Sequence, residues 1–264
     1  MKKIFLFACM ILACTLSSNA QTSQLELEEG ATKLFNGKDL ENWYTYIANR
    51  GKNVDPNGVF TVEDGVIHIT GEEWGCITTD LEYENYKFTF RYKWGEKTWG
   101  PRINSARDSG LLFHSIGEDG ASSNCWMNSI EVNVIEGRTG DFIVIGNGSD
   151  KFALTSKMRV EEGGYFFDPI NGKTHTIVAD GRLDWINVDK DWKDVKGFVG
   201  ANDIENPHGE WNVLECVVIG DEIYVFLNGK FINYGSQIRP SKGKIQIQSE
   251  GAELFVSDVI IKQY

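Results

Sequence analysis

Residues 86–94 read Tyr86-Lys-Phe-Thr-Phe-Arg-Tyr-Lys-Trp94, a run in which every second residue is aromatic. Successive side chains of a β-strand point to opposite faces, so the five aromatic rings share one face. A strand with one apolar and one polar face packs against a core on a single side, as in antiparallel sheets. The run therefore predicts a strand of an antiparallel sheet that covers a hydrophobic core.

Short strands and tight turns continue on both sides of this run. Asp64-Gly65 and Asn228-Gly229 each stand between two strand-like segments, and such dipeptides favour two-residue hairpin turns. No stretch of 12 or more residues keeps an apolar period of 3.6, so helices should be few. These patterns predict an all-β, antiparallel β-sandwich.

The first 20 residues have the form of a signal peptide. Two lysines precede the apolar run Ile4–Ala13, and small and polar residues lead to a cleavage site after Ala20. The apolar run is too short to span a bilayer, which takes about 20 residues. We therefore expect export to the periplasm or surface of a Gram-negative bacterium. A lipobox ending at Cys14 is the alternative, and it would leave the protein lipid-anchored.

The remainder divides into a polar lead, residues 21–30, and one domain, residues 31–264. Removal of residues 1–20 changes the net charge from −12 to −14, which disfavours nucleic acid and anionic membranes as partners. Three cysteines remain, so at most one disulfide can form. The chain has 8 Trp, 9 Tyr and 15 Phe, which suit sugar stacking and a sandwich core equally well.

The strand Ser129–Arg138 carries the first candidate site residues. Its even-numbered residues from 130 to 134 are aliphatic and should enter the core, which leaves Glu131 and Asn133 on the outer face. Arg138 and Asp141 follow directly, close enough in sequence to join them on one surface. A solvated outer face is the alternative interpretation of the same pattern.

Glu136 has the wrong parity to share a face with Glu131 on a regular strand. A β-bulge near Val134–Ile135 would bring the two together. Glu-x-Asn-x-x-Glu then resembles the Glu-x-Asp-x-x-Glu signature of laminarinase-type retaining glycosidases, whose two glutamates act as nucleophile and acid/base. Asn133 replaces the middle aspartate of that signature.

Other segments add further candidates. Asp108 and His114 flank Gly110 on a second predicted strand, where a glycine marks close approach by a ligand or another backbone. His114 is either a proton carrier or a satisfied surface histidine. Gln248 lies on a face shared with two other polar residues. The irregular segment Asp180–His208 contains Trp192 and is either a functional loop or the cover of a sheet edge.

No cofactor is predicted. The four His are scattered and there is no close His or Cys pair of the kind that binds zinc. Calcium held by Asp and backbone oxygens stays open.

Taken in order, several motifs resemble the 3-keto-disaccharide hydrolase domain family along nearly the whole predicted domain. They are Leu34-Phe-Asn-Gly-Lys-Asp-Leu40 with Trp43, Val62-Glu-Asp-Gly65 with Thr78, Asp108-Ser-Gly-Leu111, Glu131-Val-Asn-Val-Ile-Glu136, Gly209-Glu-Trp-Asn212, Leu227-Asn-Gly229 and Gly243-Lys-Ile-Gln-Ile-Gln248. The chain departs from the family at His114, where relatives often have Arg, and at Asn133, where they often have Gln.

The resemblance implies a concanavalin A-like jelly-roll sandwich that cleaves glycosides oxidised to a ketone at carbon 3. In such a sugar a base removes the proton from carbon 2, the enediolate expels the group on carbon 1, and water adds afterwards. On this basis Glu131 is the expected base, Arg138 or a cation the oxyanion partner, and His114 or Glu136 the acid. Asn133, Asp108, Asp141, Trp192 and Gln248 are expected to bind substrate.

Two other functions fit the same residues. The chain could be a conventional retaining glycosidase that uses Glu131 and Glu136, or a sandwich that binds glycans without cleaving them. All three take a carbohydrate partner, and all leave the oligomeric state open.

Overall fold

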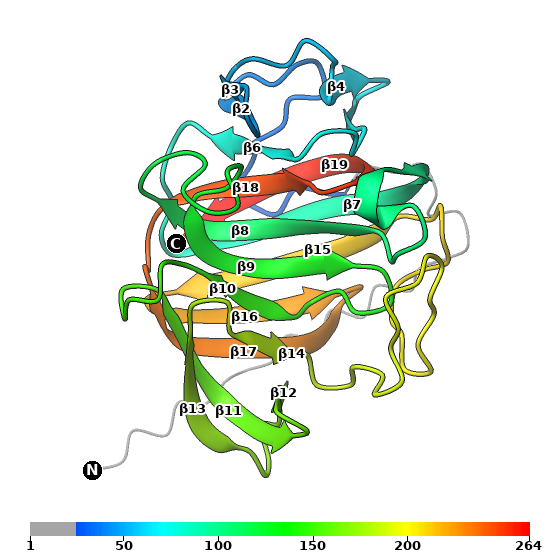
Figure 1. The fold of residues 1–264 in the computed structure, drawn as a ribbon. Helices are drawn as coiled ribbons and strands as arrows, with labels where there is room; N and C mark the ends of the chain where they lie inside the picture. Colours follow the sequence, from blue (N-terminus) through cyan, green and yellow to red (C-terminus); the bar gives the residue numbers. More distant parts are fainter. Residues whose placement is uncertain (1–24) are drawn as a thin grey trace.

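The computed structural model describes residues 25–264, so the predicted signal peptide and Cys14 lie outside the described residues. Two β-sheets pack face to face (Figure 1). The front sheet faces the viewer in Figure 1 and has the order β3-β2-β6-β18-β8-β9-β10-β14-β12-β11-β13. The back sheet has the order β4-β5-β19-β7-β15-β16-β17, with β1 also paired to β19.

All pairings are antiparallel except β12 with β14, and β17 pairs with both β16 and β11, which links the two sheets. The front strands are β2 Trp43–Ile47, β3 Gly51–Lys52, β6 Gly75–Thr79, β8 Asp108–Ile116, β9 Asn128–Ile135, β10 Phe142–Ile145, β11 Ala153–Glu161, β12 Gly164–Phe167, β13 Lys173–Val178, β14 Arg182–Asp184 and β18 Lys244–Ser249. The back strands are β1 Ala31–Lys33, β4 Phe60–Glu63, β5 Val66–Ile69, β7 Tyr86–Thr98, β15 Asn212–Ile219, β16 Glu222–Leu227, β17 Lys230–Arg239 and β19 Ala252–Gln263.

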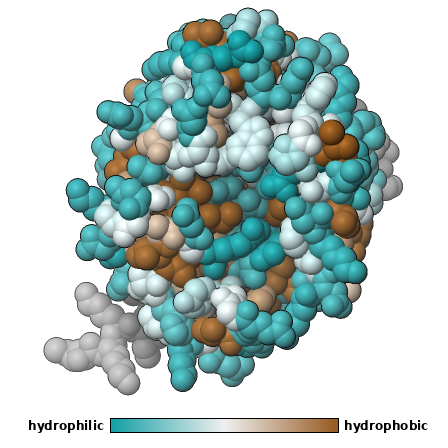
Figure 2. Space-filling model, in the orientation of Figure 1, coloured by the Kyte–Doolittle hydropathy of each residue, from teal (hydrophilic) through white to brown (hydrophobic). Residues whose placement is uncertain are grey.

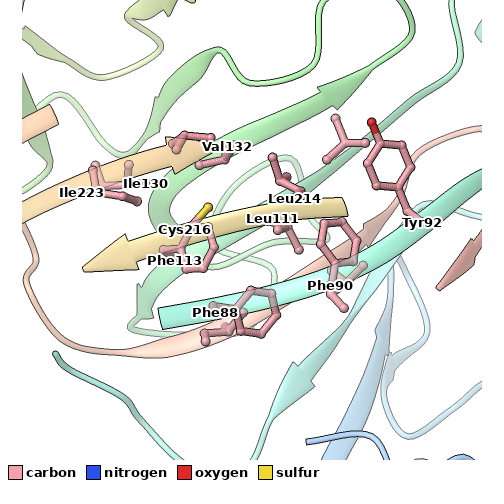
Figure 3. Close-up of a cluster of buried hydrophobic side chains, with 14 of the residues drawn as sticks. Phe88, Phe90, Tyr92, Leu111, Phe113, Ile130, Val132, Leu214, Cys216 and Ile223 are labelled. Atoms are coloured by element: carbon pink, nitrogen blue, oxygen red, sulfur yellow. The ribbon is translucent and has the colours of Figure 1, made fainter. Parts of the chain in front are cut away.

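The core lies between the sheets and confirms the alternation read from residues 86–94. All five aromatic side chains of that run are buried and belong to one core cluster with the aliphatic face of β9 and the apolar residues of β8. Figure 3 shows three of them, Phe88, Phe90 and Tyr92, in this cluster. Phe88 of β7 and Phe113 of β8 pack edge to face with ring centroids 5.6 Å apart. Burial of large side chains on both inner faces is what holds the sandwich together.

Both predicted hairpin turns are confirmed. The dipeptides Asp64-Gly65 and Asn228-Gly229 connect β4 to β5 and β16 to β17, with positive φ at all four residues, as a type I′ turn requires. Within residues 25–264 the only helix is the short 3-10 turn η1, Gly100–Arg102. No helix in that part of the chain is long and apolar enough to cross a membrane.

One irregularity shapes the front sheet. Between Phe113 and Ile116 the register of β8 slips against both of its neighbours, β9 and β18. The extra residue belongs to a β-bulge in which His114 has φ 53°. In contrast, β9 keeps a regular register with β8 from Ile130 to Ile135. The β-bulge near Val134–Ile135 that would bring Glu136 onto the face of Glu131 is therefore not present in β9.

Candidate active site

A row of residues crosses the outer face of the front sheet, from β18 through β8, β9, β10 and β14 to β12. Residues opposite each other on paired strands share a face, so the strand registers place the members of this row in line. We call it the cross-strand row, and it consists of Gln248, Gly110, Asn133, Asp141, Asp184 and Phe166. Neighbouring strands lie about 4.8 Å apart, so the row is roughly 24 Å long. Figure 2 shows this face hollowed near its middle, with hydrophilic side chains in the hollow.

Three acidic side chains gather beside the row, and we call them the carboxylate cluster: Asp108, Glu131 and Glu250. The Asn133 amide links two of them, because Nδ2 donates to Glu131 Oε1 at 3.2 Å and to Asp108 Oδ1 at 3.4 Å. Arg102 pairs with Asp108, and its Nη2 lies 3.7 Å from Glu250 Oε1. The cluster therefore holds three carboxyl groups within reach of one another and one directly paired cation.

Burial raises the pKa of every member of the cluster. The pKa of Glu131 rises to about 8, first because of burial and then because of the charge of Asp108. The pKa of Asp108 rises to about 6, since burial outweighs the lowering by Arg102 and Arg182. Burial also raises the pKa of Glu250 well above its usual range. Groups shifted toward neutral pH can both take and give protons there, as acid–base catalysis requires.

Gly110 explains how the cluster can form. A Cβ at this position would lie 2.4 Å from Glu131 Oε1 and 2.5 Å from Gln248 Oε1. Only glycine leaves room for both side chains to converge over β8. The glycine was expected to admit a ligand or another backbone, and in the structure it admits the side chains of Glu131 and Gln248.

Several buried polar atoms at this place have no hydrogen-bond partner among the described residues. They are both amide atoms of Gln248 and the Oδ1 atom of Asn133, although Gln248 is only 1% exposed. Leaving a buried polar atom unpaired costs about 1–3 kcal/mol. Unpaired donors and acceptors in a polar hollow are suited to bind the hydroxyl and carbonyl groups of a ligand.

Arginines border the cluster on the β10 and β14 side. Asp141 is fully buried and accepts from Arg138 Nε at 2.6 Å, from Arg182 Nε at 2.9 Å and from the Trp185 amide at 2.8 Å. Arg138 also pairs with Asp184. Because its oxygens are taken up by these contacts, Asp141 orients the two arginines rather than presenting itself to a ligand.

Trp192 lies at the far end of this arginine network. The Arg138 guanidinium stacks over its indole ring at 5.0 Å, and the indole Nε1 donates to the Glu136 carbonyl at 3.1 Å. Trp192 and Arg138 line a cavity of about 300 Å³. The segment Asp180–His208 thus brings a tryptophan to the edge of the polar face.

The structure does not bring His114 to the site. The bulge in β8 turns its side chain into the core, where the ring packs edge-on against Tyr86 at 5.9 Å and Nδ1 donates to the Pro240 carbonyl at 2.9 Å. The side chain is fully buried, and burial lowers the pKa of His114 to about 4. The prediction that His114 shares a face with Gly110 is wrong, because the period of two fails across a bulge.

Glu136 is also separate from Glu131. It lies just beyond the regular end of β9 and pairs with Arg107, with Oε1 2.6 Å from Nη1. Its Oε2 accepts from the Arg107 amide at 3.2 Å and from the Gly197 amide at 2.8 Å. Glu136 therefore anchors the long loop after β14 to the sheet, and it does not pair with Glu131.

Three charged residues of the site were not assigned a role from the sequence: Arg102, Arg182 and Glu250. Arg182 lies opposite Ile143, which in turn lies opposite Glu131. The alternation of Gln246, Gln248 and Glu250 indicated their shared face, whereas nothing local pointed to the arginines. Within residues 25–264, no group of three or more His, Cys, Asp or Glu side chains is arranged to hold a metal ion.

Three solved structures are similar to this chain, and the first of them supports the fold. A candidate glycosyl hydrolase from Parabacteroides distasonis ATCC 8503 has a TM-score of 0.52 and 21% identity, over 91% of this chain and 99% of its own. A second candidate glycosyl hydrolase from that organism has a TM-score of 0.49 and 19% identity, over 89% and 99%. A Bacillus licheniformis β-glucanase has a TM-score of 0.44 and 10% identity, over 89% and 98%.

No protein with a curated description matches the sequence. The model of one domain family does match, over residues 30–262, which is most of the chain. The sandwich, the motifs along it and this match agree: the chain belongs to the family of 3-keto-alpha-glucoside-1,2-lyase-like domains.

Proposed function

We propose that this protein is an exported enzyme that cleaves 3-keto-glycosides by proton abstraction at carbon 2, elimination of the group on carbon 1, and hydration. The observation that carries the proposal is the carboxylate cluster: the buried Asp108 and Glu131 and the half-buried Glu250 all have raised pKa values, and they lie beside unpaired amide atoms. Membership of the 3-keto-alpha-glucoside-1,2-lyase-like family supports it. A ketone at carbon 3 acidifies the proton on carbon 2, so a carboxylate is a sufficient base.

Glu131 is the proposed base. Its ionised carboxylate takes the carbon 2 proton. The electron pair of the C–H bond forms a double bond between carbons 2 and 3, and the π electrons of the ketone move onto the carbon 3 oxygen to give an enediolate. With a pKa of about 8, Glu131 is a stronger base than an ordinary carboxylate, and a useful fraction is ionised near neutral pH.

The enediolate oxygen needs hydrogen-bond donors. The first candidate is the unpaired Nε2 of Gln248, whose side chain converges with that of Glu131 over Gly110. Arg182 contributes positive charge, which offsets part of the rise that burial causes in the pKa values of Glu131 and Asp108. Arg138, which the family resemblance suggested for this role, is held by Asp141 and Asp184 and supports the site through them.

Collapse of the enediolate breaks the bond between carbon 1 and the leaving oxygen and forms a double bond between carbons 1 and 2. The leaving oxygen takes a proton from Glu250, whose pKa burial raises well above its usual range, in place of His114 or Glu136. Water then adds across the double bond, with hydroxyl at carbon 1 and a proton returning to carbon 2, and releases the 3-keto sugar.

Purified protein should cleave methyl 3-keto-glucoside and leave methyl glucoside intact. In deuterated water the released sugar should carry deuterium at carbon 2. Glu131→Gln should remove turnover while the protein stays folded. The reverse substrate preference would instead support a conventional glycosidase. Cleavage of neither glycoside would end the enzymatic proposal, and retained turnover in Glu131→Gln would exclude that residue as the base.

A further inference from the structure

A second hydrophobic cluster lies on the outer face of the front sheet, separate from the core between the sheets. The Trp74 and Trp126 rings stack in it, with centroids 5.5 Å apart and 24° between their planes. We call it the outer apolar cluster: its buried members are Cys76, Leu112, Cys125 and Trp126, and the partly exposed Tyr46, Ala48 and Trp74 pack against them.

The outer apolar cluster lies directly beside Glu250. Ser249 of β18 pairs with Gly75 of β6, so the next residues, Glu250 and Trp74, lie opposite each other on the outer face. Neighbouring strands are about 4.8 Å apart. Ser249 Oγ donates to the Glu73 carbonyl at 2.7 Å, so the two segments stay together past Gly75.

The electrostatics of Cys125 agree with this placement. Burial, then Cys76 and then Glu250 raise the pKa of the Cys125 thiol. The charges of Asp108 and Glu131 in turn raise the pKa of Glu250. Glu250 therefore interacts with the carboxylate cluster on one side and with the outer apolar cluster on the other.

We propose that the outer apolar cluster binds the leaving group of the substrate, and that this group is aromatic. The inference rests on the proposed function, in which Glu250 gives a proton to the leaving oxygen, and it adds the class of aglycone. Because that oxygen must reach Glu250, the group attached to it lies next to Trp74, one strand away.

The polar atoms of the buried cluster members are already paired. Trp126 Nε1 donates to the Gly75 carbonyl at 3.3 Å. The Cys76 thiol donates to the Cys125 carbonyl at 3.4 Å, and the Cys125 thiol donates to the Ser123 carbonyl at 3.3 Å. A sugar hydroxyl pressed against this surface would lose water and gain no partner from these groups, whereas an aromatic ring has no such cost.

Unpaired polar atoms lie on the other side of Glu250. Both amide atoms of Gln248 and the Oδ1 atom of Asn133 have no hydrogen-bond partner within residues 25–264. They suit the oxygen atoms of the 3-keto sugar, while the stacked Trp74 and Trp126 rings suit a flat apolar group. The outer face thus offers a polar half to the sugar and an aromatic half to the leaving group.

The test uses three 3-keto-glucosides of one anomeric configuration, whose leaving groups are methanol, benzyl alcohol and the O6 hydroxyl of methyl glucoside. In all three the leaving oxygen is bonded to a saturated carbon and has similar basicity, so differences in kcat/KM report contacts with the leaving group. We expect the wild-type protein to prefer the benzyl substrate to each of the other two by about tenfold.

Trp74→Ala should bring the benzyl-to-methyl ratio of kcat/KM close to one, and Trp74→Phe should keep most of the preference. Trp211→Ala is the matched control, because Trp211 stacks with Arg91 and Lys93 of the back sheet. It should leave the ratio unchanged.

An unchanged ratio in a folded Trp74→Ala variant would overturn the assignment of the cluster. A wild-type preference for the O6 sugar or the methyl substrate over the benzyl substrate would overturn the aromatic class. Either result with the methyl substrate still cleaved leaves the proposed function standing. If the wild-type protein cleaves none of the three, the proposed function fails and this inference fails with it.

Discussion

The replacement Glu131→Gln should stabilise the protein at alkaline pH while it removes activity. Glu131 is only 3% exposed, and its pKa rises from an ordinary 4.5 to about 8. The folded state thus holds this proton more tightly than the unfolded state does. As the pH rises from 4.5 to 8, the unfolded chain releases the proton first, and the free energy of unfolding falls.

The size of the effect follows from those two values. Each pH unit between them costs about 1.4 kcal/mol, so ionisable Glu131 lowers stability by roughly 3 kcal/mol at pH 7 and roughly 4 kcal/mol at pH 8. Glutamine carries none of this penalty, and its amide oxygen can still accept from Asn133 Nδ2. Asp108 and Glu250 interact with Glu131, and their own ionisation reduces the gain. We therefore expect Glu131→Gln to raise the free energy of unfolding by about 2 kcal/mol at pH 8, which corresponds to a rise in Tm of about 4–8 °C.

Thermal unfolding of wild type and Glu131→Gln at pH 5, 6, 7 and 8 measures this directly. The difference in Tm should be near zero at pH 5 and grow with pH. Glu41→Gln, at an exposed glutamate, is the matched control and should show no such trend. A difference that is constant with pH, or a variant less stable than wild type at pH 8, would refute the reasoning.

Substitutions at three further positions, Glu136, Gly110 and His114, test the assignments of these residues. Glu136→Ala leaves the buried Arg107 guanidinium without its partner and should lower the free energy of unfolding by about 3 kcal/mol, measured in urea. Glu136→Gln should leave the pH profile of kcat unchanged. Loss of turnover in a fully folded Glu136→Gln variant would instead identify Glu136 as a catalytic residue. Gly110→Ala should reduce kcat/KM at least tenfold, because the new methyl group displaces the Glu131 carboxylate; an unaffected enzyme would contradict that contact. Asparagine tolerates the positive φ at position 114, so His114→Asn should leave kcat and its pH dependence unchanged. Loss of one limb of the pH profile of kcat in this variant would instead assign His114 a chemical role.

The site was only partly predictable from the sequence, because some of its residues lie on regular strands and others reach it from a turn. Glu131, Asn133 and Gln248 were identifiable, since each lies on a regular strand whose period of two sets its face. Arg102 comes from a 3-10 turn and reaches Asp108 through its long side chain. No local pattern indicates such a contact.

The sequence by itself determined the all-β sandwich, the inward aromatic face of residues 86–94, both hairpin turns and the outward position of Glu131. These features follow from alternation and turn chemistry, which act between residues close in the chain. Tertiary structure alone decided that His114 turns into the core, that Glu136 pairs with Arg107, and that burial raises the pKa values of the carboxylate cluster. Each of these depends on which distant strands pair and in which register, and a one-residue slip in register reverses the face of every side chain beyond it.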